Sequence, residues 1–221
     1  MQLDFSIILN YIPDFFKALG VTLQVTFAAL LMGLLFSIPL SLCKISNIKP
    51  LQWIASFYTS IFRGVPLMVQ VFMMYFGIPL VLPVRFTAFQ AGSLVFAMNS
   101  AAYISESMRG GITAIDRGQY EAAMALGVHY PSMMKDIILP QAIKSVLPSL
   151  VNEFISLLKN TTLIASIGLV DILRVGQLIQ SRTYRAFEPF FAISVFYYVL
   201  VMALSFVGKL LERWVNKSDR H

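Results

Sequence analysis

The sequence predicts an all-α membrane protein, and its composition and its long apolar runs both point to this fold class. The chain has 221 residues, of which 57% are hydrophobic and only 13% are charged, whereas a soluble domain has nearer a quarter of charged residues. Since about 20 apolar helical residues cross the hydrocarbon core of a bilayer, an uncharged run of that length is a candidate span. Four such runs are residues 18–43, 64–84, 86–105 and 189–208.

A fifth run, residues 145–170, is long enough to cross the bilayer but contains Glu153 and Lys159. An odd number of spans places the two termini on opposite sides of the membrane. With the C-terminus inside, 11 Lys and Arg residues lie on the inner side and five on the outer side, and this bias predicts an N-out, C-in orientation. We therefore predict that residues 1–221 form one membrane domain with five spans, at about 18–43, 53–84, 86–112, 145–170 and 188–210.

Other features of the composition exclude several classes of protein. The net charge of +6 is spread among the apolar runs, which favours anchoring of inner loops over nucleic-acid binding. The single Cys43 cannot form an intrachain disulfide, and His129 and His221 do not form a metal-ligand set. No basic segment precedes the first apolar run, so we expect no cleaved signal peptide. The chain has no G-x-x-x-x-G-K-[ST] motif, so we expect it to bind no nucleotide cofactor by that route.

A charged insert, residues 116–142, lies between the third and fourth predicted spans. Residues 120–126 predict a short helix of strong helix formers, with Asp116 as its N-terminal cap or Gly127 closing its C-terminus. Pro131 starts a second helix, and Pro140 and Pro148 are expected to break or bend the chain on its way into the fourth span. The insert thus reads as a cytoplasmic helix-turn-helix, which composition alone cannot distinguish from a simple connector.

The fourth predicted span has a polar stripe that falls within an arc of roughly 120° on a helix. Such a stripe must face protein or water, because lipid cannot satisfy its hydrogen bonds. Glu153 and Lys159 stand about 9 Å apart along the axis, a separation that suits the two charges of a zwitterion. The alternative is that each residue pairs with a charge on a neighbouring helix. The stripe consists of Ser149, Asn152, Glu153, Ser156, Lys159 and Asn160.

The third predicted span repeats this pattern with Asn99, Tyr103 and Glu106 on one face. Arg109 follows Glu106 by three residues, so an internal bridge between the two is the alternative to contact with a ligand. The pair Gly110–Gly111 is expected to loosen or end this helix.

A kink is expected at the inner start of the second span, where Gly64 and Pro66 follow Arg63. Arg63 is interpreted first as an interfacial anchor and only secondarily as a ligand for a substrate.

The insert resembles the EAA loop of the permease subunits of bacterial ABC importers. Glu121-Ala122-Ala123 is followed at the family's spacing by Gly127 and by Ile137-x-Leu139-Pro140. Four more stretches are similar to the polar amino acid branch of that family, of the histidine, arginine and glutamine type, and they occur in its order. Asp171 stands where the family commonly has Glu. These stretches are residues 63–70, 102–112, 152–163 and 167–173.

This resemblance implies a transmembrane permease subunit in the bacterial inner membrane that imports a polar amino acid, with a basic one as a candidate, by alternating access. It also implies two ATPase subunits that bind ATP and Mg²⁺, a second identical or homologous permease, and an external or periplasmic solute-binding protein. The EAA loop would dock on the ATPase through Glu121, Ala122, Ala123, Gly127, Leu139 and Pro140. Residues expected to bind the substrate are Asn99, Glu106, Arg109, Asn152, Glu153, Ser156, Lys159 and Asn160.

Two other classes of function remain open at this point. A stand-alone carrier or channel would need no ATPase, but no inverted repeat is visible in the sequence. An intramembrane enzyme could use Glu106 or Glu153 as an acid or base, but no nucleophile or metal ligand accompanies them. We therefore expect no catalytic residue and no metal site in this chain.

Overall fold

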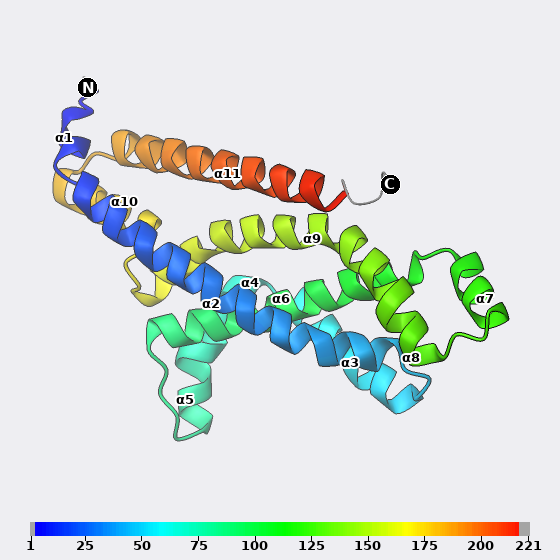
Figure 1. The fold of residues 1–221 in the computed structure, drawn as a ribbon. Coiled ribbons are helices and arrows are strands. Elements are labelled where there is room, and N and C mark those ends of the chain that lie inside the picture. Colours follow the sequence, from blue (N-terminus) through cyan, green and yellow to red (C-terminus); the bar gives the residue numbers. More distant parts are fainter. Residues whose placement is uncertain (1–2, 217–221) are drawn as a thin grey trace.

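The computed structural model describes residues 3–216, and in that part every regular element is a helix (Figure 1). The predicted all-α class is therefore confirmed. Among these elements η1 and η2 are π-helical turns and η3 is a 3₁₀ helix. The elements are α1 (Ser6–Leu9), α2 (Ile12–Ile45), α3 (Lys49–Gly64), α4 (Leu67–Phe72), η1 (Met73–Gly77), α5 (Ile78–Val81), α6 (Ala88–Thr113), α7 (Arg117–Ala125), α8 (Tyr130–Met133), η2 (Met134–Ile138), α9 (Leu139–Asn160), η3 (Thr161–Ile167), α10 (Ile172–Thr183) and α11 (Phe187–Asn216).

Two described helices, α2 and α11, are by themselves long and apolar enough to cross a membrane. Up to four spans result if each of two bent helix pairs counts as one, α3 with α4–α5 and α8–η3 with α10. The third predicted span, α6, is not among them, because its serines, Gln90 and Asn99 lower its hydropathy. The multi-pass architecture thus agrees with the sequence, while the count of five spans and their orientation stay predictions.

The second predicted span is sharply broken near Pro66. The axes of α3 and the α4–α5 segment differ by 102°. Val65 has an extended backbone, with φ −90° and ψ 134°, because the ring of a following proline disfavours the helical region. The sequence predicted a kink at this place, but residues 53–84 do not form one straight span.

Close packing of α2 against α6 forms the centre of the fold (Figure 1). Gly33 of α2 allows this approach, since a Cβ atom there would lie 3.0 Å from Cβ of Ser100 and 3.2 Å from the carbonyl oxygen of Ala97. Small residues at such contacts are the usual way for membrane helices to pack closely, because lipid provides no hydrophobic drive between them. The core around this contact includes Val25, Ala29, Val71, Ala91, Val95, Phe96, Leu157, Ile164 and Ile167.

Helix α6 continues through Gly110 and Gly111 to Thr113, so the expectation that these glycines end the helix is wrong. Gly111 is buried against α9, and a Cβ atom there would clash with Val146 and lie 3.2 Å from the backbone oxygen of Ala142. A Cβ atom on Gly110 would meet nothing within 4 Å. Gly111 therefore serves the packing of α6 against α9, which tertiary contacts decide.

This difference predicts opposite effects for two neighbouring substitutions. Gly111→Ala should lower the melting temperature of the purified protein, since overpacking of a tight contact costs about 1–3 kcal/mol. Gly110→Ala is the matched control and should leave the melting temperature unchanged or raise it, because alanine favours a helix by about 0.5–1 kcal/mol over glycine. Equal melting temperatures for the two variants would contradict the packing role of Gly111.

The insert that resembles the EAA loop forms α7, α8 and η2 and is here called the coupling loop, after its predicted role. It lies at one end of the molecule, and α1 and α10 lie at the other (Figure 1). From Tyr130 the chain stays helical through η2 and α9 to Asn160. Pro140 lies two residues after the π-helical turn η2 in this continuous helix, and Pro148 lies inside α9. Neither proline interrupts the helix, although α9 changes direction along its length (Figure 1).

The predicted orientation can be measured with reporter fusions. A reporter fused after His221, which lies outside the described residues, should be cytoplasmic, and one inserted near Ser181 in α10 should be external. The physical reason is the excess of Lys and Arg on the inner segments. Alkaline phosphatase and green fluorescent protein fusions at both sites measure this. Two reporters on the same side of the membrane would contradict the five-span topology.

Candidate functional site

A cavity of about 590 Å³ lies between the end of α3, the start of α4, α6 and α9. Its volume is in the range of small-molecule sites. Five of the eight residues predicted to bind a substrate line it, together with Arg63 and Tyr103, which the sequence analysis did not include in that set. The five are Asn99, Glu153, Ser156, Lys159 and Asn160.

Glu153 faces this cavity from α9 and accepts a short hydrogen bond from the hydroxyl of Ser100 on α6. Ser100 is fully buried, so it holds the carboxylate from the side of the protein core. Arg109, a cation on the neighbouring helix α6, pairs with Glu106 and not with Glu153. Among the residues that the structure describes, no ion pair to Glu153 is formed.

Lys159 lines the same cavity six residues further along α9, about 1.7 turns, and its side chain is exposed. No ion pair to Lys159 is formed within residues 3–216. The two opposite charges on α9 thus remain separated by about 9 Å along the helix axis instead of neutralising each other. An anion and a separate cation on one cavity wall can orient a zwitterion, and Arg63 adds a second cation to the lining.

Asn99 lines the cavity but also holds the broken second span together. Its side-chain nitrogen donates to the carbonyl oxygen of Phe62 at 2.6 Å. The side-chain nitrogen of Gln70 donates to the same oxygen at 3.0 Å and to the carbonyl oxygen of Val65 at 2.8 Å. These bonds satisfy carbonyl groups that lose their helical partners at the Pro66 break, as buried backbone in a membrane protein requires.

Arg63 and Tyr103 complete the wall of the cavity on its other side. The guanidinium carbon of Arg63 lies 5.0 Å from the centre of the Tyr103 ring, a distance at which a cation and an aromatic face attract. The sequence favours an interfacial anchor as the role of Arg63, whereas its side chain lines the cavity. The periodic stripe on α6 already contained Tyr103, and this periodicity was the signal that could have identified it.

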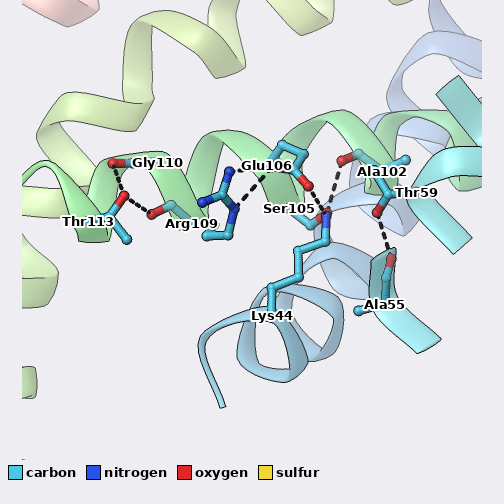
Figure 2. Close-up of polar contacts among 9 residues, drawn as sticks. All are labelled: Lys44, Ala55, Thr59, Ala102, Ser105, Glu106, Arg109, Gly110 and Thr113. Carbon is cyan, nitrogen blue, oxygen red and sulfur yellow. Dashed lines mark hydrogen bonds and ion pairs between the residues drawn. The ribbon is translucent and has the colours of Figure 1, made fainter. Parts of the chain in front are cut away.

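Glu106 and Arg109 do not line the cavity; they form an ion-pair cluster with Lys44 of α2 (Figure 2). The ammonium of Lys44 donates to Glu106 at 2.8 Å and to the hydroxyl of Ser105 at 2.7 Å. Arg109 pairs with the other carboxylate oxygen of Glu106 at 2.9 Å. The internal Glu106–Arg109 bridge considered as an alternative is therefore present, and the side chain of Lys44, only 3% exposed, adds a link from α2 to α6.

Asn152 also lies outside the lining of the cavity. It borders a smaller groove beside it, together with Ser107 and Ser149. The structure therefore divides the predicted set into five residues at the cavity, one at an adjoining groove, and two in the ion-pair cluster.

The coupling loop has a small core of its own. Asp116 caps α7 by accepting a hydrogen bond from the backbone N–H of Gly118 at 2.6 Å. Ala123, 3% exposed, packs with Met133 and Ile138, so its small size serves contacts inside the loop. Tyr120 packs against this core, and burial raises the pKa of its hydroxyl.

The outward face of the loop combines polar and apolar residues. Gly127 ends α7 with a φ of +72°, a conformation that favours glycine, and a Cβ atom there would meet nothing within 4 Å. Leu126 is 82% exposed. Such uncovered apolar side chains at the end of a membrane protein mark a surface for a partner. The exposed residues of the loop and of the start of α9 include Glu121, Ala122, Met124, Leu126, Gly127, Tyr130, Leu139 and Pro140.

Comparison with known proteins identifies the family of this chain. Residues 29–217 match the family described as binding-protein-dependent transport system inner membrane component. The chain is 46% identical to the arginine transport system permease protein ArtQ of Bacillus subtilis over 99% of this chain and all of that protein. It is 45% identical to a putative glutamine transport system permease protein GlnP of Rickettsia felis, over 87% of this chain and 88% of that one.

Solved structures show the same fold. A crystal structure described as an amino acid ABC transporter with histidines superposes with a TM-score of 0.91 and 42% identity, over 96% of this chain and 99% of that chain. An inward-facing structure of the MetNI methionine ABC transporter has a TM-score of 0.79 at 20% identity, over 93% of this chain and 98% of that chain, and shows the fold alone. The protein is therefore a multi-pass component of the inner membrane and not itself an enzyme, and it belongs to the binding-protein-dependent transport family as the permease subunit of an amino acid ABC importer.

Proposed function

We propose that the cavity between α3, α6 and α9 binds a basic amino acid during its import. The observation that supports this is the pair of opposite, separated charges, Glu153 and Lys159, on the wall of one cavity. Glu153 would accept the side-chain cation, and Lys159 with Asn160 would hold the carboxylate. Charge-assisted hydrogen bonds of this kind are about twice as strong as neutral ones, so they can fix the orientation of a small zwitterion.

The name of the relative from Bacillus subtilis, an arginine transport permease, favours a basic substrate. Other relatives are named for glutamine, and with a neutral substrate Glu153 would instead meet the α-amino group. Ser156 and Asn99 contribute polar surface to the same cavity and suit either substrate. We assign Glu106 and Arg109 to the link between α2 and α6, because their charges already neutralise each other there.

The working transporter would contain two ATPase subunits, a second permease copy or a homologous permease, and an external solute-binding protein. ATP and Mg²⁺ would bind to the ATPase subunits. The coupling loop would dock on one ATPase through Glu121, Ala122 and Gly127, with Leu139 and Pro140 at the edge of the contact and Ala123 supporting the loop from within. Closure of the ATPase dimer would then change the tilt of the membrane helices and alternate the access to the cavity.

Reconstitution with the ATPase subunits and the cognate binding protein tests this proposal. Each amino acid is added to proteoliposomes in turn, and stimulation of ATP hydrolysis and uptake of the labelled amino acid are measured. Arginine, lysine or histidine should stimulate both, and acidic amino acids should not. Stimulation by glutamine alone would move the substrate to the neutral class. Uptake without ATP would favour a stand-alone carrier.

A further inference from the structure

The side chain of Tyr103 borders three separate spaces, which are one cavity and two grooves. It lines the substrate cavity and also a groove of about 440 Å³ between α3 and α6, here called the inner groove. It borders the small groove beside Asn152 as well. Arg63 is shared by the cavity and the inner groove. The inner groove is lined by Ser56, Thr59, Ser60, Arg63, Gly64, Tyr103 and Glu106.

The inner groove lies on the side of Tyr103 that faces the coupling loop. Along α6, Tyr103 stands about 6 Å beyond Asn99 and Glu106 about 10 Å beyond it, at 1.5 Å per residue, and this direction leads to the coupling loop after Thr113. Lys44, near the end of α2, reaches Glu106 at this level of α6 (Figure 2). A solute that leaves the cavity through the inner groove therefore passes Tyr103 first and Glu106 afterwards.

The chemistry of the inner groove suits passage of a polar solute. Ser56 and Ser60 present hydroxyl groups that can replace water around a charged molecule. Both carboxylate oxygens of Glu106 are bound, one by Lys44 and one by Arg109, so Glu106 adds polarity without a strong unpaired charge. A transport path needs sites that are favourable enough to enter but weak enough to leave.

Tyr103 is held in place by a cation–π contact with Arg63, which a movement of Arg63 can break. Its ring is 5.0 Å from the guanidinium carbon of Arg63, and Tyr103 as a whole is 39% exposed. Arg63 lies in the last turn of α3, directly before the 102° break between α3 and α4. A change in the angle between α3 and α4 would therefore move the guanidinium away from the ring and release it.

We propose that Tyr103, held by Arg63, is the barrier at the coupling-loop side of the substrate cavity, and that the inner groove is the exit path of the amino acid. The proposal rests on the proposed function, because it takes the cavity as the binding site. In it, Tyr103 is a positioning residue whose ring closes the path, while Ser56, Ser60 and Glu106 form a transit surface for a hydrated zwitterion.

Cysteine accessibility tests the barrier without any substrate. The sole cysteine is first removed as Cys43→Ser, and single cysteines are then placed in the cavity as Leu67→Cys and in the inner groove as Ser60→Cys. The full transporter with its ATPase subunits, in inside-out vesicles without nucleotide, is treated with a small membrane-impermeant methanethiosulfonate reagent. Ser60→Cys should react quickly and Leu67→Cys slowly, because Tyr103 stands between the reagent and the cavity.

Adding Tyr103→Ala should accelerate labelling of Leu67→Cys about tenfold or more, equivalent to a barrier lower by about 1.4 kcal/mol. Tyr103→Phe keeps the ring and should preserve the slow rate, and Arg63→Gln should give a smaller acceleration than Tyr103→Ala. Unchanged labelling of Ser60→Cys shows that each variant is folded. Fast labelling of Leu67→Cys with Tyr103 intact, or no acceleration in both Tyr103→Ala and Arg63→Gln, would overturn the proposal. No amino acid is added in this experiment. Its result therefore tests the barrier even if the cavity does not bind arginine.

Discussion

Glu153→Gln is expected to lower the affinity of the transporter for arginine by roughly 10–100-fold. A hydrogen bond to a charged group contributes on the order of 1.5–3 kcal/mol, and 1.4 kcal/mol corresponds to a factor of ten. Glutamine keeps the size of the side chain and can still accept the bond from Ser100, so the substitution removes the charge and little else. Binding of labelled arginine to the purified, folded transporter measures the effect, and the melting temperature is recorded beside it.

Glu106→Gln is the matched control, since the same chemical change is made on a carboxylate outside the cavity. It should leave arginine affinity near the wild-type value and lower the melting temperature, because Lys44 is left buried without its anionic partner. Glu153→Gln should show the reverse pattern. If Glu153→Gln lowers only the melting temperature and arginine still binds normally, Glu153 has a structural role and the proposed site is wrong.

Gly127→Trp is expected to abolish uptake while leaving the amount of permease in the membrane unchanged. The substitution puts a large ring on the exposed face of the coupling loop, where Gly127 meets no atom of this chain, so the bulk would meet the ATPase subunit. Copurification of the ATPase with the permease and ATP-driven uptake in proteoliposomes are the two measurements. We expect the variant to lose both the copurifying ATPase and the ATP-driven uptake.

Gly127→Asn separates the effect of bulk from that of the backbone. Gly127 has a φ of +72°, and asparagine tolerates this left-handed region better than other non-glycine residues, so this variant should keep most of the uptake. Ala122→Trp places the same bulk on an exposed helical position with no such strain and should also abolish uptake. Normal uptake by both tryptophan variants would remove the coupling role of this surface.

The sequence by itself determined the features that depend on neighbours in the chain. Uncharged runs predicted α2 and α11, because a helix is the structure that satisfies its own backbone in lipid. The resemblance to the EAA loop implied a coupling role for the insert, and the sequence offered Asp116 as the cap of its first helix, which it is. The period of 3.6 residues placed Glu153, Ser156 and Lys159 on one face of α9, and that face does line the cavity.

The tertiary structure alone decided which of the predicted polar residues meet. A kink could be read from Pro66, but its 102° angle depends on the packing of α3 and α4 against α6, and this angle brings Arg63 to Tyr103. Lys44 and Glu106 are separated by 62 positions in the chain, so no local pattern indicates their bond. Helical periodicity fixes the face on which a side chain lies, but not which other helix that face meets. The division of the polar residues between the cavity and the ion-pair cluster therefore follows from helix packing.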